Sequence, residues 1–384
     1  MRAVFLMTSV AAASACTGDT DCQLNGACTN GVCVCDKGWK SANCGILNLD
    51  GNANYLYGYN ATSNFSSWGG GPPVLGPNGK YHLYISEIAA HCGMSTWSRM
   101  STSSHAISDK VNGPYTKVKT IVGTESHNTI YVYSPVDKMH LIYTIKTGTS
   151  PESCNPYLKC ANGTTPGGHA LHPPAGWAPS TCSGPGGYGV IHSATDVNGP
   201  WTNAGAFAVA PLPKRPDTAG TSNPSPYIFP NGTVLLIGRG KDATRYPNGT
   251  VERHHNIFLY RAPHWNATYE WVPSDGVKGA INVGAGNDGP STEDPHFYRG
   301  RRGFHILFHS SPDFTHAWSE DGLTWAWNKT ISGPPTHGAG YDNERPRVVL
   351  DANRDLDWLF TGQLVGTTAG GGDDGARTAA FQAL

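Results

Sequence analysis

Side chains able to transfer protons or contact a ligand recur at one position of this 384-residue sequence, at the start of five apolar hairpin segments. The pairs Glu293-Asp294 and Glu344-Arg345 bring carboxyl groups to this position. A carboxyl group can donate or accept a proton, so these residues are candidates for a general acid and a general base. The other residues at this position are suited to binding or hydrogen bonding: Trp68, His127, Asn128 and Asn223.

An internal repeat must position these residues. Its unit is an apolar strand, a tight turn and a second apolar strand, and it occurs five times, from Pro72, Asn128, Ser225, Pro295 and Pro346. A second unit, with His-x-x-Ser/Thr and Gly-Pro-aromatic, follows from His105, His192 and, more loosely, His316. Few charged residues (14%) and many turn residues (48 Gly, 28 Pro) accompany the repeat. Together these features predict an all-β fold, a five-bladed propeller over residues 46–384, with a β-sandwich as the alternative.

The propeller prediction gathers the polar residues at one place. Inner strands line the axis of a propeller, so their starting ends crowd one mouth of the central funnel. We therefore expect a single site there, to which His91 and Trp97 add binding groups from the first blade. Arg239 and Arg345 would hold an acidic sugar or support carboxylates, and the second role is the commoner one for arginine.

The N-terminus has the features of an export signal. Residues 1–15 combine Arg2, a short apolar run and the small residues Ala13-Ser14-Ala15, which predicts a cleaved signal peptide and no membrane span. Six cysteines follow within residues 16–45: Cys16, Cys22, Cys28, Cys33, Cys35 and Cys44. So small a segment needs cross-links, but the spacing alone allows fifteen pairings. A zinc cluster is the other use of such cysteines, and no histidine lies among them.

The segment CTGDTDCQLNGACTNGVCVCDKGWKSANC resembles an EGF-like module. The resemblance implies the pairs Cys16–Cys28, Cys22–Cys33 and Cys35–Cys44, and it suggests a protein partner for the module. The remaining cysteines predict two further disulfides of open connectivity: Cys92, Cys154, Cys160 and Cys182.

Secretion is also indicated by seven Asn-x-Ser/Thr sites, at Asn60, Asn64, Asn162, Asn231, Asn248, Asn266 and Asn328. Each becomes a surface glycan only if the chain enters a secretory pathway. We therefore expect an extracellular glycoprotein. The net charge of -1 gives no electrostatic reason to expect nucleic acid or an anionic membrane as a partner.

The five-bladed arrangement resembles glycoside hydrolase family 43 and related β-fructosidase folds. The segment EDPHFYRGRRGFHIL is similar to the fourth-blade motif of that family, which makes Glu293 the general acid. The segment NPSPYIFPNGTVLLI is similar to the third-blade motif, but Asn223 stands where the family has an aspartate that tunes the acid. In the first blade Gly69-Gly70-Gly71 replaces the family's catalytic base. A neutral Asn cannot raise the pKa of a neighbouring acid as a carboxylate does.

These departures leave three interpretations. The base comes from another carboxylate, with Glu87, Glu125, Glu344 and Asp294 as candidates. A histidine, His91 or His127, accepts the proton instead. In the third interpretation the site binds a glycan and hydrolyses nothing.

From the sequence we predict a secreted glycoside-hydrolase-like protein acting on an extracellular poly- or oligosaccharide, with a non-catalytic glycan-binding protein as the alternative. The predicted catalytic residues are Glu293, Asn223 and Glu344. The predicted substrate-binding residues are Trp68, His91, His127, Asn128, Asp294 and Arg345. We expect no cofactor and no metal site in the sequence; the resemblance allows an axial calcium ion, for which the sequence offers no set of ligands.

Overall fold

A computed structural model describes residues 15–50, 58–59, 66–89, 92–145, 189–210, 222–245, 251–272, 280–281, 293–310, 313–331, 343–365 and 375–384. In these ranges the chain is almost entirely β-structure. The helical residues among them form the 3-10 turn Met94–Thr96 and the short helix α1 (Trp97–Met100). No helix in the described ranges is long and apolar enough to cross a membrane.

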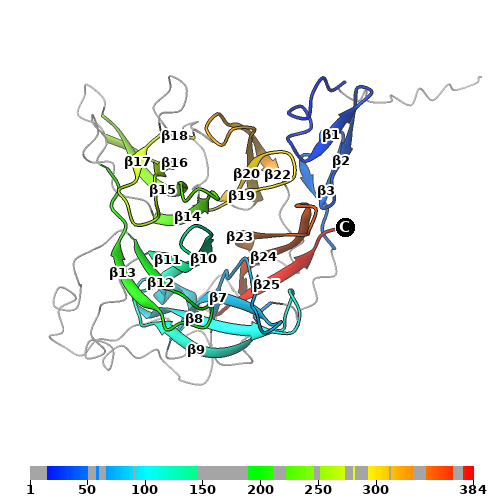
Figure 1. The fold of residues 1–384 in the computed structure, drawn as a ribbon. Helices are drawn as coiled ribbons and strands as arrows, with labels where there is room; N and C mark the ends of the chain where they lie inside the picture. The colour runs from blue at the N-terminus through cyan, green and yellow to red at the C-terminus, as the bar shows by residue number, and fades with distance from the viewer. Residues whose placement is uncertain are drawn as a thin grey trace, which may run out of the picture.

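Five antiparallel sheets follow one another in chain order around a common axis, as Figure 1 shows, so the predicted five-bladed propeller is confirmed. Blade 1 contains β5 (Ser67–Trp68), β6 (Val74–Leu75), β7 (Tyr81–Ile88), β8 (Ser101–Ser108) and β9 (Thr116–Val122). Blade 2 contains β10 (His127–Ser134), β11 (Met139–Ile145), β12 (Val190–Ala194) and β13 (Thr202–Ala206). Blade 3 contains β14 (Ser222–Ile228), β15 (Val234–Arg245), β16 (Val251–Ala262), β17 (Glu270–Trp271) and β18 (Ala280–Ile281).

The last two blades follow the same pattern. Blade 4 contains β19 (Glu293–Arg299), β20 (Phe304–Ser310), β21 (Asp313–Ser319) and β22 (Ala326–Ile331). Blade 5 contains β23 (Asn343–Leu350), β24 (Leu356–Val365) and β25 (Gly375–Gln382). Each hairpin repeat of the sequence therefore supplies the inner part of one blade.

Packing between neighbouring blades explains why the strands carry apolar runs instead of strict alternation. In blade 2, Leu141, Ile142 and Tyr143 are all buried, because one face of the sheet packs on blade 1 and the other on blade 3. Strands covered on both faces read as continuous apolar segments. The same holds for Val234–Ile237 in blade 3.

The ring is closed by both ends of the propeller. The C-terminal strand β25 pairs with β24, and bridges from Leu49 to Ala383 and from Tyr59 to Thr378 add the N-terminal side of the chain to the same sheet. The side chain of Ser67 accepts a hydrogen bond from the Thr378 amide at 3.0 Å, which ties blade 1 to blade 5.

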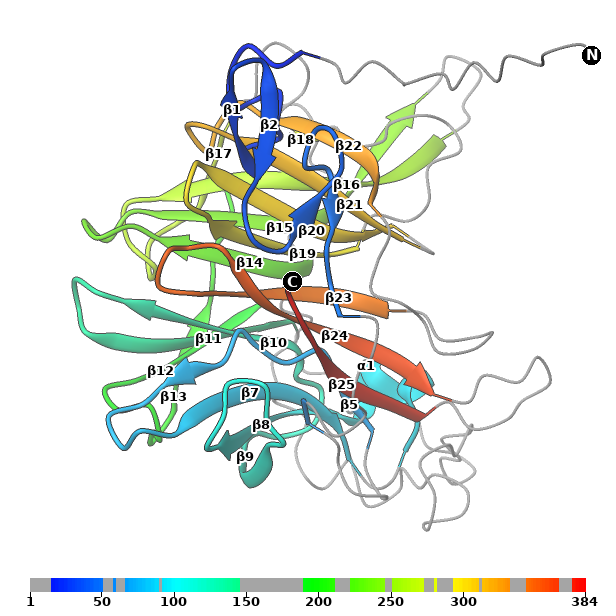
Figure 2. The same ribbon diagram turned by 90° about the vertical axis from the view of Figure 1, so that its right-hand side faces the viewer.

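The N-terminal module has the disulfides that the EGF-like resemblance implied: Cys16–Cys28, Cys22–Cys33 and Cys35–Cys44. It contains β1 (Gly26–Thr29), β2 (Val32–Cys35), β3 (Trp39–Lys40) and β4 (Ile46–Leu47). The module stands against blades 4 and 5, as Figure 2 shows from the side. Trp39 and Leu47 join one apolar cluster with Leu307 of blade 4 and Leu356 of blade 5.

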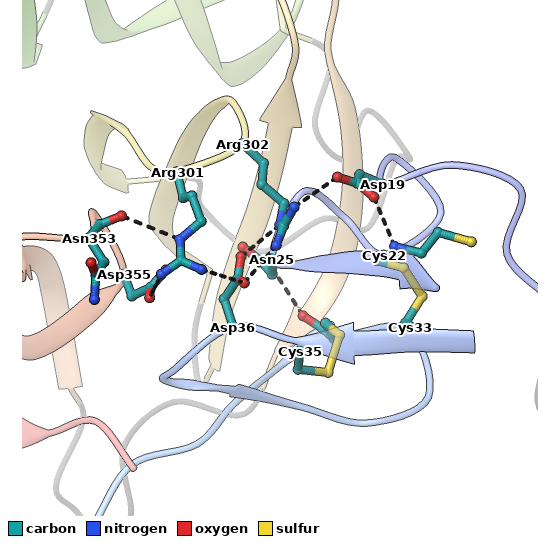
Figure 3. A network of polar contacts seen from close by, with 12 residues as sticks. Asp19, Cys22, Asn25, Cys33, Cys35, Asp36, Arg301, Arg302, Asn353 and Asp355 are labelled. Carbon is teal, nitrogen blue, oxygen red and sulfur yellow. Dashed lines mark hydrogen bonds and ion pairs between the residues drawn. A yellow bond between two sulfur atoms is a disulfide. The ribbon is translucent and has the colours of Figure 1, made fainter. Parts of the chain in front are cut away.

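A polar clamp, which we define as Asp19, Asp36, Arg301, Arg302 and Asp355, fixes the module on the propeller (Figure 3). Arg302 donates to both carboxylate oxygens of Asp36, at 2.9 and 3.0 Å, and to Asp19 at 3.0 Å. Arg301 pairs with Asp355 of blade 5 and lies 3.7 Å from Asp36. A bidentate arginine–carboxylate contact is among the stronger polar contacts in proteins. The clamp therefore gives the module a fixed orientation.

Cys92 is disulfide-bonded. Cys154, Cys160 and Cys182 lie outside the described residues, so the pairing of this second group stays open. His91 and the glycosylation sites at Asn60, Asn64, Asn162 and Asn248 also lie outside them.

Candidate active site at the mouth of the propeller

One residue near the start of the inner strand of blades 2 to 5, and in blade 1 the residue that follows β5, has a left-handed backbone. We call these five residues the axial ring: Gly69 (φ 42°), Asn128 (φ 56°), Asn223 (φ 53°), Asp294 (φ 50°) and Arg345 (φ 54°). In blades 2 to 5 each ring residue lies where the register between the inner strand and its neighbour shifts. A bulge of this kind re-aims a side chain. Non-glycine residues seldom adopt this conformation, so its recurrence at the same place in four blades indicates that the fold requires it there.

The side chains of the axial ring meet on the carboxylate of Asp294. Asn128 donates to its Oδ1 at 2.9 Å and Asn223 donates to the same oxygen at 2.7 Å. The guanidinium of Arg345 lies 3.8 Å from that oxygen. Asp294 is only 3% exposed and Arg345 is fully buried. Four blades are thus joined through one buried charge.

Gly69, the fifth residue of the axial ring, has no side chain, and this leaves space for the side chain of Arg345. A Cβ at Gly69 would overlap the methylene groups of Arg345, and the arginine also donates to the Thr129 carbonyl at 3.0 Å. Arg347 lies below it and donates to the Pro295 carbonyl at 3.1 Å. Burial lowers the pKa of Arg347 to about 10, while the charge of Asp294 acts in the opposite direction. Arg345, for which the sequence offered substrate binding or support of a carboxylate, is fully buried and lies beside Asp294.

The contacts of the Asp294 carboxylate do not match those of a calcium ligand. Calcium takes six to eight oxygen ligands. Around Asp294 the neighbours are amide N–H groups and a guanidinium, which are donors and a cation. We therefore derive no step through an axial metal ion.

The residue that precedes each ring residue lies at the same end of its blade, where inner strands of a propeller approach its mouth. These mouth residues are Trp68, His127, Ser222, Glu293 and Glu344. Two of them are carboxylic acids on neighbouring blades, with side chains that are 30% and 23% exposed for Glu293 and Glu344. They are thus the accessible acids of this position, in contrast to the buried Asp294.

Side chains of the adjacent strand connect the two mouth acids. Glu293 forms an ion pair with Arg239 of β15 at 2.5 Å. His309 of β20 is the cross-strand partner of Glu293, and its Nδ1 lies 3.8 Å from the Glu344 carboxylate. Directly opposed residues of an antiparallel pair have side chains in reach of each other. Blades 3, 4 and 5 therefore present one guanidinium, two carboxyl groups and one imidazole in a row.

The sequence left Arg239 two roles, binding an acidic sugar or supporting a carboxylate, and in the structure Arg239 contacts the Glu293 carboxylate. Sequence reasoning missed His309, which lies near the end of the second hairpin strand in the fourth repeat. His309 could have been found from its position in the hairpin, because aligning the two strands with the bulge at Asp294 places His309 opposite Glu293.

The first two blades place aromatic rings at this end of the propeller, most of them buried. Trp68 is 3% exposed and covers Gly362 of β24, where a Cβ would come within 2.8 Å of the indole. His127 is buried, with its Nδ1 2.7 Å from the Ser101 hydroxyl, and its ring lies 4.9 Å from that of Trp97. Trp97 itself is 36% exposed. It is the more accessible of the two tryptophans that were predicted to contact a ligand.

Glu87, a candidate base of the sequence, and His296, a residue of the fourth-blade motif, have partners away from the mouth acids. The carboxylate of Glu87, a candidate base, is 2% exposed and accepts hydrogen bonds from Tyr59 at 2.8 Å and Lys117 at 2.5 Å. This burial makes it a link between strands. His296 of the fourth-blade motif accepts the Val348 amide at 2.8 Å, and burial lowers its pKa well below the usual range. It is thus a neutral link between blades 4 and 5.

Comparisons with known proteins agree on the architecture. No protein-family model matches the chain, and no curated protein is similar to it in sequence. Among solved structures it is similar to a family 117 glycoside hydrolase of the marine bacterium Zobellia galactanivorans, with 13% identity, a TM-score of 0.55, and 86% of this chain and 89% of that one covered. The fold is the five-bladed β-propeller of these glycoside hydrolases.

Two further structures support this fold assignment. A family 43 β-xylosidase/α-arabinofuranosidase from a compost metagenome, solved with xylotriose, has 9% identity and a TM-score of 0.51, with 86% of this chain and 94% of that one covered. A family 43 β-1,3-galactosidase with galactodeoxynojirimycin has the same identity and TM-score, with 85% and 94% covered. At these identities the similarity concerns the glycoside hydrolase fold alone.

Proposed function

We propose that this protein is a secreted glycoside hydrolase that acts on an extracellular poly- or oligosaccharide through Glu293 and Glu344. The observation that carries the proposal is the pair of accessible carboxyl groups on neighbouring inner strands, at the mouth of a glycosidase fold. His309 lies between them, so the two groups flank one imidazole ring. An inverting enzyme needs a gap of roughly 6.5–9.5 Å between its two carboxyl groups, which leaves room for a water molecule, and the proposal requires this gap between Glu293 and Glu344.

In this proposal Glu293 is the general acid and Glu344 the general base that activates water. A proton donor must be protonated when the leaving group departs, and Arg239 competes for the same carboxyl oxygen of Glu293. We therefore expect bound substrate to displace Arg239 from Glu293 and to place the glycosidic oxygen there. Asn223 and Asn128 act indirectly, by fixing Asp294 and with it the strand that carries Glu293.

The test is release of reducing ends from a panel of polysaccharides by the wild-type protein and by Glu293→Gln and Glu344→Gln. Glu270→Gln, at an exposed position of blade 3, is the matched control. We expect losses of roughly 100-fold or more for both mouth variants and none for the control. An aryl glycoside with a good leaving group needs no acid, so it should restore the rate of Glu293→Gln but not that of Glu344→Gln.

A non-catalytic glycan-binding protein remains the second proposal, because of a specific observation. The axial ring has a glycine in blade 1 and an asparagine in blade 3, where the family resemblance leads one to expect carboxylates. Binding of a polysaccharide with no release that depends on Glu293 or Glu344 would favour this function.

Secretion belongs to the same proposal. The three disulfides fit an oxidising compartment. Asn231 and Asn266, two predicted glycosylation sites, are exposed. Enzymatic deglycosylation of the protein from culture medium should lower its mass, and Asn231→Gln and Asn266→Gln should each reduce that change. A protein partner of the EGF-like module would need the hairpin face with Val32 (54% exposed) and Val34 (57% exposed), because Asp19, Asp36 and Trp39 already contact the propeller.

A further inference from the structure

We propose a second carbohydrate-binding site, in the groove between the EGF-like module and the outer edge of blade 4. The groove has a volume of about 490 Å³ and is lined by Thr20 and Asp21 of the module and by residues of blade 4 that include Trp318, Glu320, Asp321 and Trp325. This volume lies in the range of small-ligand sites, about 300–1,000 Å³. The site is separate from the mouth and does not depend on its activity.

The groove exists because the module covers only part of an aromatic ladder on blade 4. The rings of Tyr298, His305 and His316 stack across β19, β20 and β21, and Trp318 stacks on His316 two residues further along β21, with neighbouring centroids 5.1 to 5.4 Å apart. The module covers His316, whose ring lies 4.9 Å from Trp39 and 3.4 Å from the Gln23 side-chain oxygen. Trp318 is the next ring outward and is only partly buried. Its indole therefore remains accessible beside Thr20 and Asp21.

Both walls of the groove are held in place. On the module side, Arg302 of the polar clamp binds Asp19, the residue directly before Thr20 and Asp21 (Figure 3). The Asp21 carboxylate also accepts the Thr17 amide at 2.7 Å, and this contact lowers its pKa. On the propeller side, Asp321 accepts the amides of Leu323 and Thr324, both at 2.7 Å. A site that is formed before its ligand arrives loses little entropy on binding.

The chemistry of the lining selects the class of ligand. Flat indole rings provide apolar surface for the C–H faces of a sugar, while carboxylates and threonine hydroxyls provide hydrogen-bonding partners for its hydroxyl groups. Among the described residues that line the groove there are three carboxylates and no Lys or Arg. Like charges repel, so the groove excludes uronic acids and sulfated sugars. The ligand class is therefore an uncharged or amino-sugar oligosaccharide.

The position of the groove separates it from the mouth along the blade. The clamp arginines follow the end of β19, whereas Glu293 begins this seven-residue strand. A strand of this length spans about 23 Å at 3.3 Å per residue. A ligand in the groove therefore leaves the mouth open, and the two sites are able to hold separate parts of one polysaccharide.

The test is isothermal titration with xylan, arabinan and β-1,3-galactan fragments, chitosan oligosaccharides and, as the anionic comparison, alginate fragments. The variants are Trp318→Ala, which removes the indole, and Ala326→Lys, which fills the groove from an exposed position of β22. Ala206→Lys, at an exposed position of β13 in blade 2, is the matched control. Each variant is also assayed for reducing-end release from a short soluble substrate.

We expect at least one uncharged or amino-sugar fragment to bind at a site that Ala326→Lys and Trp318→Ala weaken by tenfold or more and that Ala206→Lys leaves intact. Activity at the mouth should stay the same in all three variants, and Glu293→Gln should retain binding in the groove. The proposal is overturned if no fragment binds in a manner that Ala326→Lys weakens, or if only alginate does so. If the protein releases no reducing ends but still binds a fragment in the groove, the proposed function is contradicted and the proposal of the groove site stands.

Discussion

Replacing Asp294 by asparagine tests whether one buried charge organises the mouth. The substitution keeps the size of the side chain and an oxygen that Asn128 and Asn223 can still reach, but it removes the counter-charge of Arg345, which is fully buried. Leaving one partner of a buried ion pair uncompensated costs about 3–5 kcal/mol of unfolding free energy. The hydrogen bonds from Asn128 and Asn223 would also become weaker, because their acceptor changes from a carboxylate to a neutral amide. We include this weakening in the expected loss of about 3–5 kcal/mol.

The measurement is guanidinium unfolding followed by tryptophan fluorescence, with disulfides intact, for Asp294→Asn, Arg345→Met and the double variant. Because both single variants leave a buried group without its partner, the double variant should lose less than their sum, by about 2 kcal/mol or more. A loss below about 1 kcal/mol for Asp294→Asn, together with additive effects, would refute the idea that this charge holds the axial ring.

Three further outcomes follow from the same structure. Gly69→Ala should lower the free energy of unfolding by clearly more than Gly79→Ala. Both glycines have positive φ (42° and 75°), but only a Cβ at position 69 would overlap a side chain, that of Arg345. Equal losses of about 1 kcal/mol for the two variants would contradict the overlap. Arg302→Ala should cost roughly 1.5–3 kcal/mol and expose the module to proteases, whereas the exposed Lys40→Ala should not; resistance equal to wild type would contradict the clamp. Burial lowers the pKa of His105 and His192 to about 4 and that of His305 to about 3, so below pH 6.5 the unfolded chain binds protons that the folded chain does not. Stability should therefore fall from pH 6.5 towards pH 4 by up to about 1.4 kcal/mol per pH unit for each histidine, and chemical unfolding at pH 7, 6 and 5 checks this, with a flat profile as the contrary result.

The fold was predictable because its elements are local. Each hairpin has its two apolar strands and its turn within a short segment, so five copies of one pattern were enough to count the blades. The disulfides were predictable for a related reason, since the spacing from Cys16 to Cys44 resembles a known module whose pairing it shares.

The roles within the site were harder to predict because they depend on a bulge. Glu293 and Asp294 are adjacent in the sequence, yet one is ion-paired at the mouth and the other is buried under two asparagines. The left-handed conformation of Asp294 turns the two side chains to different surroundings, and no apolar pattern encodes it. The contacts of Arg302 with Asp19 and Asp36 join residues more than 260 positions apart, which spacing alone cannot relate.

The composition of the axial ring explains why the mouth acids lie where they do. The ring contains one carboxylate, Asp294, and one guanidinium, Arg345, with two neutral amides and a glycine. A carboxylate at the position of Asn223 would place a like charge at hydrogen-bonding distance from Asp294, and a side chain at Gly69 would overlap Arg345, the residue that balances the charge of Asp294. The absence of both and the burial of Asp294 are therefore parts of one arrangement. It confines the charge of the axis to an internal pair and leaves Glu293 and Glu344, one position earlier, as the accessible carboxyl groups to which the proposed function assigns proton transfer.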